Sequence, residues 1–104
     1  MLFVVIAIDK ENGLPLRLAS REAHFAFVRE TGVVKLGGPF LDVNGDMAGS
    51  LIIFEADNLA AAKDWHAGDP YVKAGLFAAS VFAQTAAPAA PAAPAAPPAP
   101  APSA

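Results

Sequence analysis

Residues 86–104 contain only alanine, proline and serine, so nearly a fifth of the 104-residue chain has no side chain able to build a core. We therefore expect one folded domain over residues 1–85 and a disordered Ala/Pro tail over residues 86–104. The tail favours polyproline II and is interpreted as a spacer, because it lacks the basic anchor of an SH3-type ligand. A domain this short buries only about 60–65% of the surface that its unfolded chain exposes, so a second subunit would add useful stability.

The composition of the folded part excludes several functional classes. All charges lie before residue 86, and the formal net charge of −3 disfavours binding to nucleic acid. The absence of cysteine excludes disulfides and thiolate metal sites and indicates a cytoplasmic protein. No apolar run is long enough to cross a membrane. The two histidines form no HExxH pair, so we expect no metal and no cofactor.

The order of the secondary structure elements can be read from the first half of the chain. Residues 2–9 are apolar and rich in β-branched side chains, which predicts a strand. Ser20 is positioned to cap a helix that runs to about Thr31, and Gly32 ends it. Residues 33–36 predict a second strand, closed by Gly37-Gly38-Pro39.

The second half continues this order. The Asn44-Gly45 turn joins the second strand to a third over residues 50–55. Asp57 or Asn58 caps a second helix that ends at Gly68, and Asp69-Pro70 opens one further helical turn. A final strand follows over residues 76–83. The βαββαβ order predicts an α+β, ferredoxin-like fold with a four-stranded antiparallel sheet and helices on one face.

The central strands carry apolar residues on both faces. We expect Phe3, Val5 and Ala7 to share a face with Leu51 and Ile53, and the other face to hold their alternate neighbours Leu2, Val4, Ile6, Ile52 and Phe54. Because helices cover only one face, the other would expose apolar surface to water at a cost of about 25 cal/mol per Å². Two sheets that pack face to face would bury it, which predicts a homodimer.

Five short motifs resemble those of one family. They are Arg21-x-x-His24, Gly38-Pro39, Gly49-Ser50, Asp69-Pro70-Tyr71 and Gly75-Leu76. In this order and spacing they resemble the YciI-like family over residues 1–83. The resemblance implies a dimeric α+β barrel with His24 and Asp69 paired in a pocket beside the sheet. The fold of this family is also similar to that of muconolactone isomerase and of small antibiotic-biosynthesis monooxygenases. This similarity indicates small, oxygenated, often ring-derived metabolites as ligands.

A His/Asp pair suits proton transfer at neutral pH. The imidazole has an ordinary pKa near 6.5, and a carboxylate on its other nitrogen fixes the tautomer and stabilises the imidazolium. We therefore predict catalytic roles for His24 and Asp69 in a lyase or isomerase. Arg21 would hold an anionic substrate and Ser50 would donate a hydrogen bond. The family motifs add Pro39 and Tyr71 to the predicted substrate-binding residues.

Each of these residues also has a purely structural interpretation. His24 can be a half-buried helix residue, Asp69 can cap the turn before proline, Ser50 can be an ordinary strand residue, and Arg21 can pair with a nearby carboxylate. His66, three residues before Asp69, is a rival partner for its carboxylate.

Trp65 is expected to pack in the core rather than against haem. The alternative function is a non-catalytic module that binds a metabolite or another protein.

Overall fold

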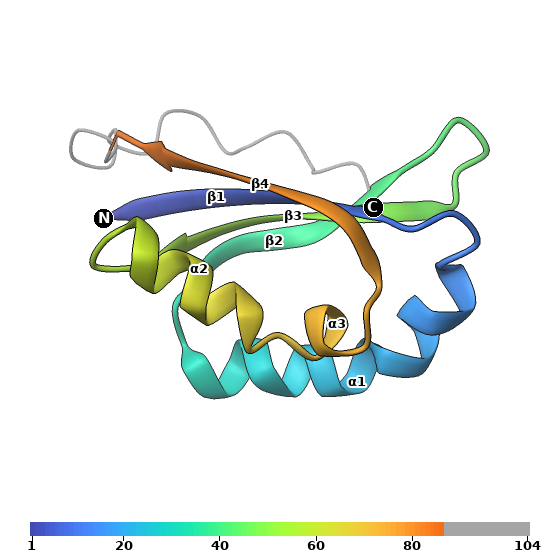
Figure 1. Cartoon of the computed structure of the whole chain (residues 1–104), viewed down its shortest axis with the longest axis horizontal. Helices are drawn as coiled ribbons and strands as arrows, with labels where there is room; N and C mark the ends of the chain where they lie inside the picture. The colour runs from blue at the N-terminus through green and yellow to red at the C-terminus, as the bar shows by residue number, and fades with distance from the viewer. Residues whose placement is uncertain (87–104) are drawn as a thin grey trace, which may run out of the picture.

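A four-stranded antiparallel sheet forms one layer of the molecule (Figure 1). The computed structural model describes residues 1–86, so the predicted tail lies outside the described residues except for Ala86. β1 (Leu2–Asp9) and β3 (Met47–Glu55) occupy the centre of the sheet. β2 (Val34–Leu41) and β4 (Phe77–Thr85) form its two edges.

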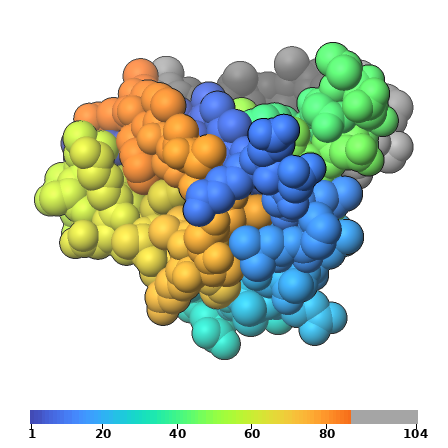
Figure 2. Space-filling view, turned by 45° about the vertical axis from the view of Figure 1, so that its right-hand side comes forward, coloured from blue at the N-terminus to red at the C-terminus, as the bar shows by residue number. Residues whose placement is uncertain are grey.

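Three helices form the second layer, all on the same side of the sheet (Figure 1). They are α1 (Leu14–Thr31), α2 (Leu59–Ala67) and the single turn α3 (Pro70–Lys73). The space-filling view shows α2 and α3, in yellow to orange, packed between β4 and the start of α1 (Figure 2). The ferredoxin-like α+β fold with helices on one face is therefore confirmed.

The start of α1 was predicted wrongly. The helix begins at Leu14, six residues before Ser20, and Gly13 is its N-cap residue without a side-chain cap. Pro15 does not block this start, because the first turn of a helix leaves its N–H groups unpaired and the ring presets the backbone angle φ. The other end is confirmed: Gly32 takes a left-handed φ of 65° and donates its N–H to Val28.

β2 also runs further than predicted. It passes through Gly37-Gly38-Pro39 and ends at Leu41. This is possible because β2 is an edge strand, where a proline without an N–H group and two glycines disturb only one ladder. The predicted caps of the other helices are confirmed, since Asn58 accepts the Ala61 N–H and Asp69 accepts the Tyr71 N–H.

The predicted assignment of side chains to the two faces was wrong by one residue in β3. Phe3 lies opposite Phe54 and Val5 lies opposite Ile52, so these four residues share the buried face. A shift of one residue moves every side chain of a strand to the opposite face, and both faces of β3 are apolar enough to hide such a shift in the sequence.

Trp65 completes the core below this face. It stacks on Phe54 with ring centroids 4.3 Å apart and contacts Phe27 at 5.2 Å. Its indole N–H donates to Thr31 Oγ1 at 3.0 Å. The prediction that Trp65 packs in the core is confirmed.

The other face of the sheet, called here the outer face, carries apolar side chains without a helix over them (Figure 1). Ile6 pairs with Val81 across the β1–β4 ladder, and Leu36 pairs with Ile53 across β2–β3. Val81 and Leu36 are 59% and 62% exposed.

Within residues 1–86, no helix is long and apolar enough to cross a membrane. The cytoplasmic location stays a prediction.

Candidate functional site

His24 and Asp69, which are 45 positions apart in the chain, lie in direct contact. The Nδ1 atom of His24 is 2.8 Å from one carboxylate oxygen of Asp69 and 2.9 Å from the other. Packing of α1 against α3 brings them together, because His24 lies on α1 and Asp69 is the N-cap residue of α3. Asp69 is completely buried and His24 is 8% exposed.

Asp69 serves two groups at once. One of its oxygens accepts the backbone N–H of Tyr71 at 2.9 Å, which caps α3, and the same carboxylate accepts from His24. The structural interpretation of Asp69 and its interpretation as a partner of His24 are therefore both met. A carboxylate only accepts hydrogen bonds, so Nδ1 of His24 carries a hydrogen, and in the neutral imidazole this places the lone pair on Nε2.

Tyr71 stacks on the ring of His24, with centroids 4.1 Å apart and planes 15° from parallel. On α1, the guanidinium of Arg17 lies 4.7 Å from the centroid of the Tyr71 ring. Burial raises the pKa of Tyr71 and the charge of Arg17 partly offsets this, so the phenol stays protonated at neutral pH. The stack holds the imidazole in one orientation.

Arg17 is a residue of the site that the sequence analysis missed. It is 2% exposed and donates two hydrogen bonds of 2.8 Å to Asp9 and one of 2.8 Å to Ser50 Oγ. Burial alone lowers the pKa of Arg17, but the hydrogen bond and charge of Asp9, aided by Tyr71, outweigh burial and raise it. In a helix that starts at Leu14, positions 17, 21 and 24 share one face, which was the missed signal.

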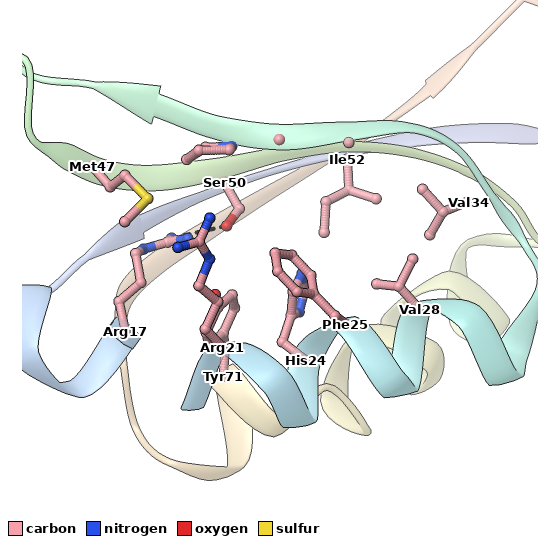
Figure 3. A pocket seen from close by; sticks show the side chains of 13 residues that line it. Arg17, Arg21, His24, Phe25, Val28, Val34, Met47, Ser50, Ile52 and Tyr71 are labelled. Atoms are coloured by element: carbon pink, nitrogen blue, oxygen red, sulfur yellow. Dashed lines mark hydrogen bonds between the residues drawn. The ribbon is translucent and has the colours of Figure 1, made fainter. Parts of the chain in front are cut away.

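A cavity of about 130 Å³ lies between α1 and the inner face of the sheet, and His24, Arg21, Ser50, Tyr71 and Pro39 all line it. Asp69 is the one predicted site residue that does not line it. Figure 3 shows the guanidinium groups of Arg17 and Arg21 pointing toward Ser50, whereas Val28, Val34 and Ile52 form the apolar opposite end.

Arg21 forms no ion pair among the described residues 1–86; its guanidinium lies 5.3 Å from the centroid of the Phe25 ring. The alternative interpretation, in which Arg21 pairs with a nearby carboxylate such as Glu22 or Asp69, is therefore not met among these residues. Its positive charge is therefore available at the mouth of the cavity, where Phe25 also lies.

The sequence profile of the YCII-related domain matches residues 1–83, a span that includes every residue of the cavity. The chain belongs to the YCII-related domain family. The predicted resemblance to YciI-like proteins is confirmed. An uncharacterised protein of Haemophilus influenzae is 40% identical, over 75% of this chain and 89% of that protein. Protein YciI of Escherichia coli O6:H1 is 36% identical, over 74% and 88%.

Two solved structures share the fold of this YCII-related domain. One is 5-chloro-2-hydroxyhydroquinone dehydrochlorinase (TftG) from Burkholderia phenoliruptrix, in complex with 2,5-dihydroxybenzoquinone. It is 32% identical with a TM-score of 0.77, covering 83% of this chain and 94% of that one. The other, an antibiotic biosynthesis monooxygenase, is 16% identical with a TM-score of 0.54, covering 84% and 98%, and shows the fold alone.

His66, the rival partner for Asp69, is occupied elsewhere in this YCII-related domain. Its Nε2 lies 3.0 Å from Ser80 Oγ, and its Nδ1 is buried without a hydrogen-bond partner among the described residues. Burial lowers the pKa of His66, partly offset by the charge of Asp69. In residues 1–86, no three His, Asp or Glu side chains come close enough together to hold a metal ion.

Proposed function

We propose that this chain is a small-molecule enzyme that moves a proton in a lyase or isomerase reaction, with His24 as general base. The observation that supports the proposal most strongly is the buried contact between His24 Nδ1 and Asp69, directly behind a cavity that His24 lines. This contact leaves Nε2 as the basic atom on the cavity side. A positioned base of this kind contributes roughly 10²–10⁴-fold to a rate.

Asp69 acts through His24. It holds the imidazole in the Nδ1–H tautomer and stabilises the imidazolium that forms when Nε2 takes a proton. Stacking on Tyr71 prevents the ring from turning away. Both supports come from α3 and its cap, so one short segment orients the base.

The size and polarity of the cavity indicate the class of substrate. Its volume of about 130 Å³ is close to that of an apolar cavity of about 150 Å³ that binds one benzene ring. Arg21 and Ser50 supply a charge and a hydroxyl at one end, and Pro39 and Tyr71 form walls. A single ring with ionisable oxygen substituents fits these features. The complex of TftG with 2,5-dihydroxybenzoquinone supports this choice, since that protein shares the fold and 32% of the sequence.

A homodimer completes the proposal. The outer face of the sheet presents Ile6, Ile8, Leu36 and Val81, each more than a third exposed. A second copy packed sheet to sheet would remove this surface from water and form an α+β barrel. The cavity lies on the helical side of the sheet, so the second copy would cover the face opposite to it.

The test is proton exchange in D₂O. Loss of the ring C–H signals of 2,5-dihydroxybenzoquinone, followed by ¹H NMR, reports addition of a deuteron to a ring carbon and removal of the original proton by a base, without needing the natural substrate. Wild type is expected to accelerate exchange above the buffer rate, and His24→Gln to lose about 100-fold or more of that acceleration. Equal exchange by wild type and His24→Gln would refute the general base. Binding of the quinone without accelerated exchange would instead indicate the non-catalytic metabolite-binding module.

A further inference from the structure

The guanidinium of Arg17 has unused hydrogen-bonding capacity. An arginine carries five N–H groups. Asp9 accepts one from Nε and one from Nη2, and Ser50 accepts the second from Nη2. Nη1 makes no hydrogen bond of good geometry to a residue within 1–86, although the Tyr71 hydroxyl interacts weakly with the guanidinium. Nη1 is not sealed in the interior, because the only fully buried side-chain nitrogen or oxygen without a partner in the described residues is Nδ1 of His66. Nη1 therefore has access to the cavity that Arg17 lines.

Ser50 has one unused donor beside it. Its Oγ accepts from Arg17 at 2.8 Å, and no described group accepts its hydroxyl hydrogen. Ser50 is 3% exposed and lines the cavity. The hydroxyl hydrogen is therefore free to be donated to a ligand, and the charge of Arg17 on the oxygen strengthens that donor.

Three contacts hold these donors in place. The two bonds to Asp9 fix the plane of the guanidinium, and the Tyr71 ring at 4.7 Å covers one of its faces. Only the edge with Nη1 remains open. A planar fork fixed in this way suits the in-plane lone pairs of a carboxylate or an ionised hydroxyl.

The charges at this end of the cavity leave room for an anion. Asp9 neutralises Arg17, and both side chains are at most 5% exposed. The second guanidinium, that of Arg21, points toward the same place (Figure 3) and has no carboxylate partner among the described residues. Asp9 therefore pairs with Arg17, and Asp69 lies behind His24 and does not line the cavity, so the guanidinium of Arg21 is the charge at this end without a paired carboxylate among residues 1–86.

We propose that Arg17 Nη1 and the Ser50 hydroxyl form a fixed oxyanion subsite, with Asp9 as the residue that positions Arg17. The ligand class is a small ring carrying an ionised hydroxyl or carboxyl group, bound with that group at Ser50 and its carbon skeleton toward Val34 and Ile52. The inference rests on the proposed function because it takes the same cavity as the substrate site. It assigns the main recognition of the anion to buried Arg17, whereas exposed Arg21 adds a weaker, screened attraction.

The experiment compares an anion with a neutral ring of the same size. Isothermal titration at pH 7 measures the affinities for 2,5-dihydroxybenzoquinone, whose acidic hydroxyls are ionised, and for neutral hydroquinone. Wild type is expected to prefer the anion by about tenfold or more, as charged hydrogen bonds predict. Ser50→Ala should weaken binding of the anion about tenfold and leave that of hydroquinone within about twofold.

The double variant Asp9→Asn, Arg17→Gln removes both charges together, so no single buried charge is left to unfold the protein. It should lose most of the preference for the anion. Arg17→Lys keeps the charge but not the planar fork, so it should also lose most of the preference for the anion. Arg21→Gln should reduce that preference by about threefold or less. Asp9→Asn alone should reduce the preference and Asp9→Glu should restore part of it, a pattern that a merely structural role does not produce.

Two results would overturn the subsite: a wild type without preference for the anion, or a double variant that keeps it. The D₂O exchange assay on the same proteins separates this outcome from failure of the proposed function. If the double variant keeps the preference for the anion and His24→Gln loses proton exchange, the Arg17 subsite is rejected and the general base is retained. If His24→Gln keeps proton exchange and the double variant loses the preference for the anion, the general base is rejected and the Arg17 subsite is retained.

Discussion

The carboxylate of Asp69 contacts Nδ1 of His24 with both oxygens, at 2.8 and 2.9 Å, while one of those oxygens also caps α3. The residue proposed to orient the base is thus also the residue that starts the helical turn carrying Tyr71. Changes at position 69 should therefore affect the fold and the site together.

Asp69→Asn is expected to separate these two roles. Asparagine keeps an oxygen that can cap α3, but its amide can also donate to His24 and so no longer fixes the ring hydrogen on Nδ1. We expect ¹⁵N NMR at about pH 8 to show His24 as the Nδ1–H tautomer in wild type and as a mixture or the Nε2–H tautomer in the variant. Proton exchange should fall by about 100-fold or more.

The matched control is Asp69→Ser, which can cap α3 but does not reach as far toward His24. It should retain the helical circular dichroism of wild type and lose exchange to a similar extent. Full exchange activity in either variant would contradict the orienting role of Asp69.

Gly37 is expected to limit the size of the ligand. A Cβ atom at Gly37 would lie 3.5 Å from Val34 and 3.8 Å from Ile52, which are ordinary contacts with two residues that line the cavity. Gly37→Ala should therefore fold normally and fill part of the cavity. We predict that it weakens binding of 2,5-dihydroxybenzoquinone about threefold to tenfold, as measured by titration.

Gly38→Ala is the control for Gly37→Ala. The two glycines are adjacent in β2 and so point to opposite faces, and a Cβ at Gly38 would meet no atom within 4 Å. Both substitutions change the backbone entropy in the same way, so only the filling of the cavity differs. Equal effects of the two variants on affinity would show that Gly37 does not limit the ligand.

Gly49 is required for a different reason. A Cβ atom there would lie 2.0 Å from the Phe40 ring and 2.4 Å from the backbone oxygen of Ala7. We expect Gly49→Ala to lower the free energy of unfolding by about 1–3 kcal/mol or more, measured by urea denaturation. Phe40→Leu should not rescue it fully, because the Ala7 oxygen stays in place. A Gly49→Ala variant as stable as Gly38→Ala would contradict the steric reason for glycine in the Gly49-Ser50 motif.

The outer face supplies a test of the dimer. Val81→Glu places a charge on the exposed apolar sheet, where a second copy would have to bury it without a partner. We expect native mass spectrometry to show a dimer for wild type and mainly monomer for Val81→Glu. Leu18→Glu is the control, since Leu18 is similarly exposed, at 51% against 59%, but lies on α1. A wild-type monomer, or a Val81→Glu dimer as stable as the control, would contradict sheet-to-sheet pairing.

The order of elements was readable from the sequence because its signals are local. Asn58 and Asp69 cap their helices through their own side chains, and Gly32 ends α1 through its own left-handed backbone. These features depend on neighbours in the chain, so the sequence states them directly.

What the sequence did not reveal depends on contacts between distant residues. Arg17 lay before the predicted start of the helix, because Ser20 offers a side-chain cap and Gly13 does not. Its partners Asp9 and Ser50 come from two different strands. The register that puts Phe3 opposite Phe54 was equally hidden, since both faces of β3 are apolar. The one long-range pair that was predicted, His24 with Asp69, came from the family motifs.

His66 predicts how stability depends on pH. Its pKa in the folded state is lowered, first by burial and then by the charge of His24, with Asp69 acting in the opposite direction. As pH falls through about 6.5, the unfolded chain takes up a proton at this position before the folded chain does. Protonation therefore stabilises the unfolded state, and the free energy of unfolding should fall between about pH 8 and about pH 5.

His66→Phe isolates this effect. Phenylalanine can keep the stacking on Phe77, and Ser80 is exposed, so its hydroxyl can bond to water instead. Urea denaturation at about pH 8 and about pH 5 should show a smaller loss of stability on acidification in the variant than in wild type. All other ionisable groups are the same in the two proteins, so the difference between the two losses reports His66. Equal losses would mean that His66 accepts a proton as readily in the folded chain as in the unfolded one, against the effect of its burial.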